Sequence, residues 1–176
     1  MTRRIWLVAL LAMGPAASLA GQEFHPPPVP RGRDQGTQLG LFGFGARGGI
    51  DLSGNTQMVV GITLDAGNLF TSRFRIRPSG EIGFFNSENS YVGSFEALYR
   101  FTGDEEAATP YAGGGFSLAG HRSCGSDPSC PALWVNFVIG FEVHYRSTFN
   151  WLLEYHAMDG FQHNRFYAGL TTRRGN

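Results

Sequence analysis

The chain has 176 residues, a length that suits one domain of ordinary size. Its 14 basic and 14 acidic residues balance, so charge gives no reason to expect nucleic acid as a partner. Charged residues make up only 16% of the chain, against roughly 25% in soluble domains. All the basic residues are arginine, aromatic residues make up 14%, and 25 residues are glycine. This composition favours a β-protein with a large apolar surface.

The first twenty residues predict a secretory signal. Arg3 and Arg4 give a positive start, and residues 5–13 (IWLVALLAM) form a short apolar core. Small residues then lead to an expected cleavage site before Gly21. A membrane anchor is the alternative, but this apolar core is too short to span a bilayer. Residues 21–36 hold four prolines and few apolar residues, which predicts an extended Pro-rich arm outside any core.

From residue 37 to residue 173 the pattern changes to apolar runs of about ten residues, separated by turn-forming clusters. Within the runs, apolar and polar side chains alternate with a period of two, as in strands whose two faces differ. The clearest run is 133–146, where nearly every second residue from Leu133 to Tyr145 is apolar. We expect eight strands, at about 39–46, 57–64, 73–85, 91–101, 111–121, 133–146, 149–157 and 165–172.

The first of these runs is ambiguous. Phe42 and Phe44 lie on the face opposite Leu39 and Leu41, so simple alternation does not assign one apolar face. Since eight regular antiparallel strands can close without a free edge, the whole pattern still predicts an up-and-down barrel, with a sandwich as the alternative.

Periodicity alone does not say which face of the barrel points inward. A soluble lipocalin-like barrel buries its apolar face, whereas a membrane barrel turns that face to lipid. Here the polar face carries small residues and arginine balanced by glutamate, without lysine, which suits a narrow interior where charges pair. Aromatic residues lie at the ends of the apolar face, as at a membrane interface. We therefore predict an all-β fold, an eight-stranded antiparallel up-and-down transmembrane β-barrel.

This assignment predicts a charge-paired network in the lumen. Its expected members are four arginines, four glutamates and two histidines: Arg75, Arg77, Glu81, Glu96, Arg100, Glu142, His144, Arg146, Glu154 and His156. Eight strands leave an interior that side chains fill, so we expect no open channel. A narrow passive pore is an alternative. We expect no cofactor and no metal.

Two cysteines, Cys124 and Cys130, lie in one polar segment, 121–130 (HRSCGSDPSC). In an exported chain, such a close pair predicts a disulfide that holds one loop. A metal site would need two further ligands, and His121 is the one candidate nearby.

The chain resembles the small eight-stranded outer-membrane β-barrel family. The resemblance covers nearly all of the mature chain and includes segments such as 110–115 (PYAGGG) and 153–156 (LEYH). It implies the bacterial outer membrane, with the Pro-rich arm and both chain ends in the periplasm. The outward loops would then be 47–55, 86–90, 121–131 and 158–164. Family barrels usually end on a C-terminal aromatic residue that the insertion machinery reads, whereas this chain continues past Tyr167 to Asn176.

A partial resemblance to outer-membrane lipid A deacylases concerns residues 156–159 (HAMD). Those enzymes carry a histidine base here, followed two residues later by a serine nucleophile. His156 matches and Asp159 is a nearby carboxylate, but the nucleophile position is Met158, which cannot attack a carbonyl. A lipid A-modifying acyl hydrolase is therefore the alternative function.

The main expectation is a structural or surface-interaction barrel. It would contact outer-membrane lipid and lipopolysaccharide, and it would meet an extracellular partner through loops 121–131 and 158–164. The side chains expected to meet phosphates or a partner there are Arg122, Phe161, His163 and Arg165.

Overall fold

The computed structural model describes residues 36–53, 56–84, 89–103, 106–126, 129–146 and 148–172. The expected signal (1–20), the Pro-rich arm except Gly36, and residue 173 lie outside these ranges. Among the described residues there is no helix with the length and hydrophobicity of a transmembrane segment.

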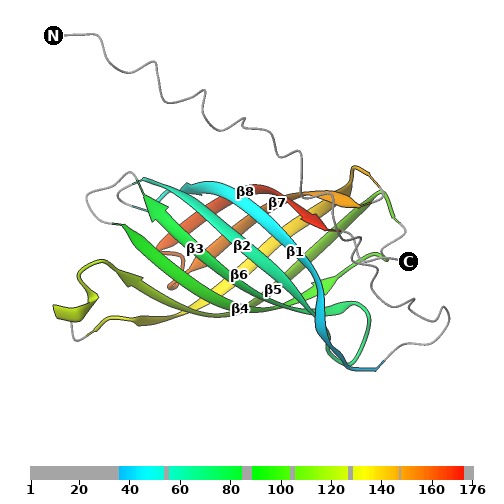
Figure 1. The fold of residues 1–176 in the computed structure, drawn as a ribbon, viewed down its shortest axis with the longest axis horizontal. Helices are drawn as coiled ribbons and strands as arrows, with labels where there is room; N and C mark the ends of the chain where they lie inside the picture. The colour runs from blue at the N-terminus through cyan, green and yellow to red at the C-terminus, as the bar shows by residue number, and fades with distance from the viewer. Residues whose placement is uncertain are drawn as a thin grey trace, which may run out of the picture.

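Eight antiparallel strands pair in chain order and close into a barrel, as predicted (Figure 1). The strands are β1 (Gln38–Asp51), β2 (Gln57–Asn68), β3 (Phe74–Phe84), β4 (Ser90–Arg100), β5 (Ala108–His121), β6 (Ala132–His144), β7 (Phe149–Met158) and β8 (His163–Thr172). A single turn of 3-10 helix, η1 (Cys124–Ser126), lies between β5 and β6. The barrel has two distinct ends. The connections β1–β2, β3–β4, β5–β6 and β7–β8 lie at one, here called the loop end, and the other is called the terminus end.

Strand β1 is longer than predicted and contains an irregularity. Its pairing with β2 shifts between Leu39, which faces Gly67, and Gly43, which faces Asp65. Such a bulge changes which face a following residue points to. Leu39 before the shift, Leu41 within it and Phe44 after it are therefore all exposed, which resolves the ambiguity of the run 39–46.

The end of β1 also corrects the sequence analysis. Residues 47–51 were expected in an outward loop, but they continue the strand and pair with both β2 and β8. Alternation from Gly43 to Asp51 directs Arg47 and Asp51 into the barrel, where both are buried. Arg47 therefore belongs to the lumen, although it was not among the expected lumen residues.

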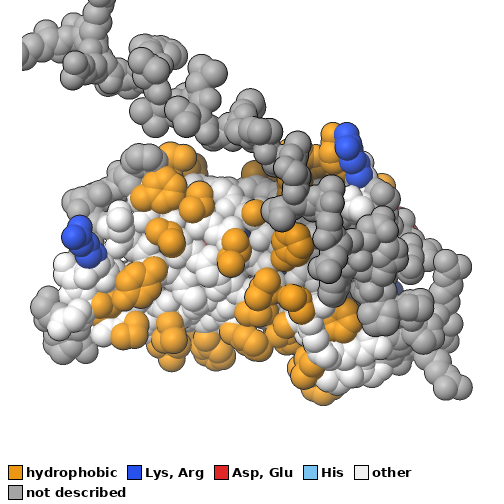
Figure 2. Space-filling view, viewed as in Figure 1, with side chains coloured by type: hydrophobic (Ala, Val, Ile, Leu, Met, Phe, Trp, Pro, Cys, Tyr) orange, Lys and Arg blue, Asp and Glu red, His pale blue; other side chains and the backbone are white. Residues whose placement is uncertain are grey.

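The exterior of the barrel is apolar. Large hydrophobic side chains from every strand are exposed, for example Ile62, Phe95, Val135 and Phe166, whereas the charged side chains of the strands point inward. Hydrophobic side chains spread over the visible wall, and the basic ones in view lie near its two ends (Figure 2). An apolar outer band around a polar interior is the pattern of a barrel that spans a bilayer.

The pairing of β1 with β8 closes the barrel and is called the seam. It runs from Gly45, opposite Thr171, to Asp51, opposite Arg165. The two backbones approach closely, because a Cβ atom at Gly49 would lie 2.0 Å from the carbonyl oxygen of Phe166. At its end, the Thr172 hydroxyl accepts from the backbone N–H of Phe44 at 2.9 Å. A side chain thus continues the hydrogen-bonded pairing beyond the backbone ladder.

Candidate functional site in the lumen

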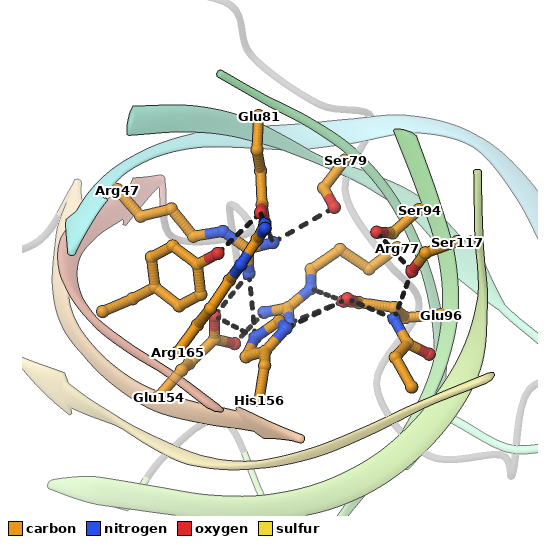
Figure 3. Close-up of polar contacts among 12 residues, drawn as sticks. Arg47, Arg77, Ser79, Glu81, Ser94, Glu96, Ser117, Glu154, His156 and Arg165 are labelled. Carbon is orange, nitrogen blue, oxygen red and sulfur yellow. Dashed lines mark hydrogen bonds and ion pairs between the residues drawn. The ribbon is translucent and has the colours of Figure 1, made fainter. Parts of the chain in front are cut away.

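Strand alternation sends polar side chains from five strands into the loop-end half of the barrel. They are called the lumen cluster, and they point toward one another across the interior (Figure 3). The members are Arg47 of β1, Arg77 and Glu81 of β3, Glu96 of β4, Glu154 and His156 of β7, and Arg165 of β8.

Arg47 lies at the centre of the lumen cluster. Its Nη1 donates to Glu154 Oε2 at 2.5 Å, and its Nη2 pairs with Glu81 Oε1. Nη2 also donates to the hydroxyl of Ser79 at 3.1 Å. The side chain is fully buried, as are both partner carboxylates. One guanidinium therefore links β1 to β3 and β7 across the lumen.

Arg77 makes the second set of ion pairs. Its Nε and Nη2 donate to Glu96 Oε2 at 3.0 and 2.8 Å, and its Nη1 pairs with Glu154 Oε1. The Tyr111 hydroxyl donates to the same Glu154 oxygen at 2.6 Å. Glu154 thus accepts from Arg47, Arg77 and Tyr111, and such charge-assisted bonds are the strong class of hydrogen bond.

Arg165 extends this set of contacts to the loop end. Its Nε donates to Asp51 Oδ2 and its Nη1 to Glu81 Oε2, both at 2.8 Å. The Tyr167 hydroxyl also donates to Glu81 Oε2, at 2.6 Å. His163 lies next to the contact between Arg165 and Asp51, with its Nδ1 3.3 Å from Asp51 Oδ2. Its ring stacks on that of Trp134, with ring centroids 4.5 Å apart.

His156 is enclosed by charged groups and has no exposed surface. Its Nε2 lies 3.1 Å from Glu154 Oε2 and 3.2 Å from Arg47 Nη1. Its Nδ1 lies 3.5 Å from Glu96 Oε1. Asn136 donates to that same Glu96 oxygen at 3.2 Å. Buried carboxylates are tolerated only when paired in this way, because an unpaired buried charge is strongly destabilising.

The terminus-end half of the lumen is organised more loosely. Arg75 and Asp65 pair at 3.3 Å, and Arg100 and Glu142 at 3.4 Å. These four side chains, with Tyr111, help to line a cavity of about 40 Å³. That volume has room for a few water molecules. Leu98 and Tyr111, which also line this cavity, belong to a buried apolar cluster with Val138 and Leu152.

The structure places the predicted lumen residues in three groups. Arg77, Glu81, Glu96, Glu154 and His156 meet in the lumen cluster, as described above. The second group lies in the terminus-end half of the lumen: Arg75, Arg100, Glu142 and the half-buried His144. Arg146 forms the third group alone.

Two placements correct the sequence analysis. Arg146 follows the end of β6, so it is exposed in the β6–β7 turn, with its guanidinium 5.3 Å from the centre of the Tyr145 ring. Arg165 was expected to meet phosphates or a partner from the last outward loop. It is only 2% exposed, because β8 begins at His163 and alternation directs Arg165 inward.

The two cysteines form the predicted disulfide, Cys124–Cys130, six residues apart in the β5–β6 loop. The ligand atoms of His121 and both cysteines lie within 4.8 Å of one another. Because both sulfurs are consumed by the disulfide, they do not offer the thiolates that bind metal ions.

The residues of the deacylase alternative are not arranged as a reactive group. His156 and Met158 are both fully buried and face the lumen. Asp159 lies in the β7–β8 turn, and no hydrogen bond or ion pair joins its carboxylate to His156 within the described residues.

Comparison with known proteins identifies the fold. No protein-family profile matches the sequence, and no curated protein matches it. Among solved structures, the N-terminal β-barrel domain of Pseudomonas aeruginosa OprF aligns with a TM-score of 0.55 at 12% identity, over 76% of this chain and 98% of that domain. Neisserial surface protein A aligns with a TM-score of 0.53 at 13% identity, over 74% of this chain and 94% of that protein. The chain has the fold of the small outer-membrane β-barrels. Together with its apolar exterior, this fold places the barrel in the bacterial outer membrane.

Proposed function

We propose that this protein is a structural or surface-interaction barrel of the outer membrane, with a lumen closed to ions. The observation that carries the proposal is the lumen cluster itself. Arg47, Glu81, Glu96 and Glu154 have no exposed side-chain surface, and each is bound by oppositely charged partners from other strands. Side chains in such mutual contact leave no continuous water path, which argues against the passive-pore alternative.

The acyl-hydrolase alternative has weaker support. A general base must come within hydrogen-bond reach of the proton that it removes, directly or through one water molecule. His156 is fully buried among Arg47, Glu96 and Glu154, and its side chain is directed away from the lipid-facing wall. A lipid ester outside the barrel would have to cross the wall to meet this imidazole.

The loops that join the strands at the loop end are the proposed interaction surface, directed out of the cell. Arg122 is exposed beside the disulfide, and Phe161 is exposed in the β7–β8 turn. A guanidinium can bind lipopolysaccharide phosphate, and an exposed ring can contact an apolar partner. The disulfide would present Arg122 from a loop of restricted shape.

Mass spectrometry of lipid A tests the proposal against its enzymatic alternative. Lipid A is compared between cells that contain the folded barrel in the outer membrane and matched cells that lack it. We expect identical acyl composition. Loss or transfer of one acyl chain would contradict the proposal. The same change in cells that express a His156→Ala variant would exclude His156 as the base of that reaction.

The outward direction of the loop end is tested on intact cells. We expect added trypsin to cleave after the exposed Arg122 while the exposed Arg146, at the terminus end, stays protected. Cleavage at Arg146 with Arg122 protected would show the opposite orientation and would remove the proposed interaction surface.

A further inference from the structure

A histidine side chain lies beside the disulfide of the β5–β6 loop. His121 is the last residue of β5, where it pairs with Ser90 of β4. The ligand atoms of His121, Cys124 and Cys130 all lie within 4.8 Å of one another, and all three residues are half-buried. A disulfide that only holds a loop has no need of an imidazole next to it. The cluster of three therefore needs a further explanation.

Two thiols and an imidazole are the kinds of side chain that bind zinc. Thiolate sulfur binds Zn²⁺ at about 2.3 Å and imidazole nitrogen at about 2.0–2.1 Å. A closed zinc site has four protein ligands, whereas an open site has three and takes water as the fourth. Soft thiolates also select such ions over Mg²⁺ and Ca²⁺, which prefer oxygen ligands. With the disulfide opened, His121, Cys124 and Cys130 are the three protein ligands of an open site.

The geometry of the loop suits this coordination. Two sulfurs on one tetrahedral zinc ion lie about 3.8 Å apart, and a sulfur and a nitrogen slightly closer. The Cα atoms of Cys124 and Cys130 are 5.1 Å apart, so both sulfurs can reach one ion. Once the disulfide is open, rotation of the two side chains separates the sulfurs. The imidazole of His121 is already within reach of the same point.

Backbone hydrogen bonds hold one half of this cluster in place. The backbone N–H of His121 donates to Cys124 Sγ at 3.4 Å, and that of Arg122 donates to the Asn89 carbonyl at 3.3 Å. An N–H directed at sulfur stabilises the negative charge of a thiolate. Hydrogen bonds to metal ligands also orient them toward the ion. The end of the barrel thus positions His121 and Cys124, and the loop brings Cys130 to them.

We propose that the β5–β6 loop is a redox-controlled site for a thiolate-binding metal ion such as Zn²⁺, held by His121, Cys124 and Cys130. A thiol reductant opens the site: two equivalents of a monothiol are oxidised to one disulfide, and each cysteine sulfur gains one electron and one proton. Binding of the ion then releases both thiol protons. The oxidised loop binds no ion. This inference goes beyond the proposed function and does not depend on which way the loop end faces.

Zinc titration calorimetry of the purified, folded barrel tests the site. One sample keeps the disulfide, and the other is reduced with dithiothreitol, which becomes a cyclic disulfide and is removed before titration without oxygen. We expect the reduced barrel to bind one Zn²⁺ per chain, at least about 100-fold more tightly than the oxidised barrel, because only the reduced form offers thiolates. Equal affinity in the two states would overturn the proposal.

Substitution of single histidines identifies the third ligand. In the reduced barrel, His121→Ala should weaken zinc binding by more than about tenfold, because loss of a group that only hydrogen-bonds to a metal ligand already costs about 10–100-fold. His25→Ala is the matched control, since His25 lies far from the loop in the sequence, within residues 21–36, and zinc affinity should not change. If His121→Ala binds zinc as tightly as the unsubstituted barrel, the proposed ligand set is wrong.

Trypsin cleavage after Arg122 reports on the loop itself. In the reduced barrel, one equivalent of Zn²⁺ should slow this cleavage to the rate of the oxidised barrel, because the ion replaces the covalent link between the two cysteines. The same zinc added to the oxidised barrel should leave its cleavage rate unchanged, which excludes an effect on trypsin. A reduced barrel that is cleaved faster than the oxidised one even with zinc present would contradict the proposal.

Discussion

Glu154 is the acceptor on which the lumen cluster depends most. It binds Arg47, Arg77 and Tyr111, and His156 lies 3.1 Å away. Removing one partner of a buried ion pair leaves the other charge uncompensated, which costs about 3–5 kcal/mol. We expect Glu154→Gln to lower the free energy of unfolding by that amount, measured by urea unfolding in lipid vesicles.

The matched control is Glu106→Gln, because Glu106 is exposed in the β4–β5 turn. Surface substitutions of this kind usually change stability by less than about 0.5 kcal/mol. Equal effects of the two substitutions would mean that the buried pairs contribute nothing beyond surface charge.

Substitution of Tyr111 or Tyr167 tests the contribution of a single hydrogen bond within the same network. Each hydroxyl donates to a buried carboxylate at 2.6 Å, to Glu154 and Glu81 respectively. A hydrogen bond to a charged group contributes about 1.5–3 kcal/mol. Tyr111→Phe and Tyr167→Phe should each lower the free energy of unfolding by an amount in that range, measured by the same unfolding assay. Each loss should be smaller than that caused by Glu154→Gln. A loss as large as that of Glu154→Gln would mean that the tyrosines, rather than the arginines, support the carboxylates.

At the scale of elements, the seam between β1 and β8 has a specific need for glycine. A Cβ at Gly49 would lie 2.0 Å from the carbonyl oxygen of Phe166, whereas at Gly48 the nearest atom is 3.9 Å away. Gly49→Ala should therefore destabilise the barrel by about 1–3 kcal/mol, the usual cost of overpacking. Gly48→Ala, one residue away on the lipid-facing side, should be neutral or should stabilise the strand by about 0.5–1 kcal/mol. The comparison is made by urea unfolding of the two variants, and the reverse order would contradict this account of the seam.

The disulfide acts on one loop rather than on the barrel. It joins residues six positions apart, so it restricts little of the unfolded chain. We expect reduction to leave the barrel folded, as judged by far-ultraviolet circular dichroism, and to speed trypsin cleavage after Arg122 in purified protein. Unchanged cleavage would show that the loop keeps its shape without the covalent link.

Strand β6 and the first part of β1 show what the sequence could and could not predict. In β6, unbroken alternation from Leu133 to Val143 identifies the strand and its apolar side, which the structure places on the outside of the barrel. In β1, the bulge between Leu39 and Gly43 interrupts the alternation, and the turn-forming pair Gly48 and Gly49 favours a loop, so the predicted strand ends at residue 46. The repeat of inward positions from Gly43 to Asp51 was a signal that could have extended it.

The individual contacts in the lumen could not be predicted from the sequence, for a different reason. Alternation predicts that Glu81, Glu96 and Glu154 point inward, but the choice of partner depends on strand register and on distances across the interior. Arg47 and Glu154 are 107 residues apart and come from β1 and β7, which are not neighbours in the sheet. Only closure of the barrel brings these side chains together.

The whole molecule combines an apolar exterior with a lumen full of paired charges. We propose that this arrangement leaves a membrane-spanning barrel without a water path through it, because the charges that would line a channel bind one another. The same arrangement leaves the turns and loops at the two ends of the barrel as the proposed contacts with lipid headgroups and partners.

The most direct test of this account is the electrical conductance of the purified, folded barrel in a planar phospholipid bilayer. A closed lumen predicts a current no higher than that of the protein-free bilayer, at every voltage that the bilayer withstands. Reproducible unit conductance steps that appear with the protein would contradict the account, because they would require an open path past Arg47, Arg77 and Glu154.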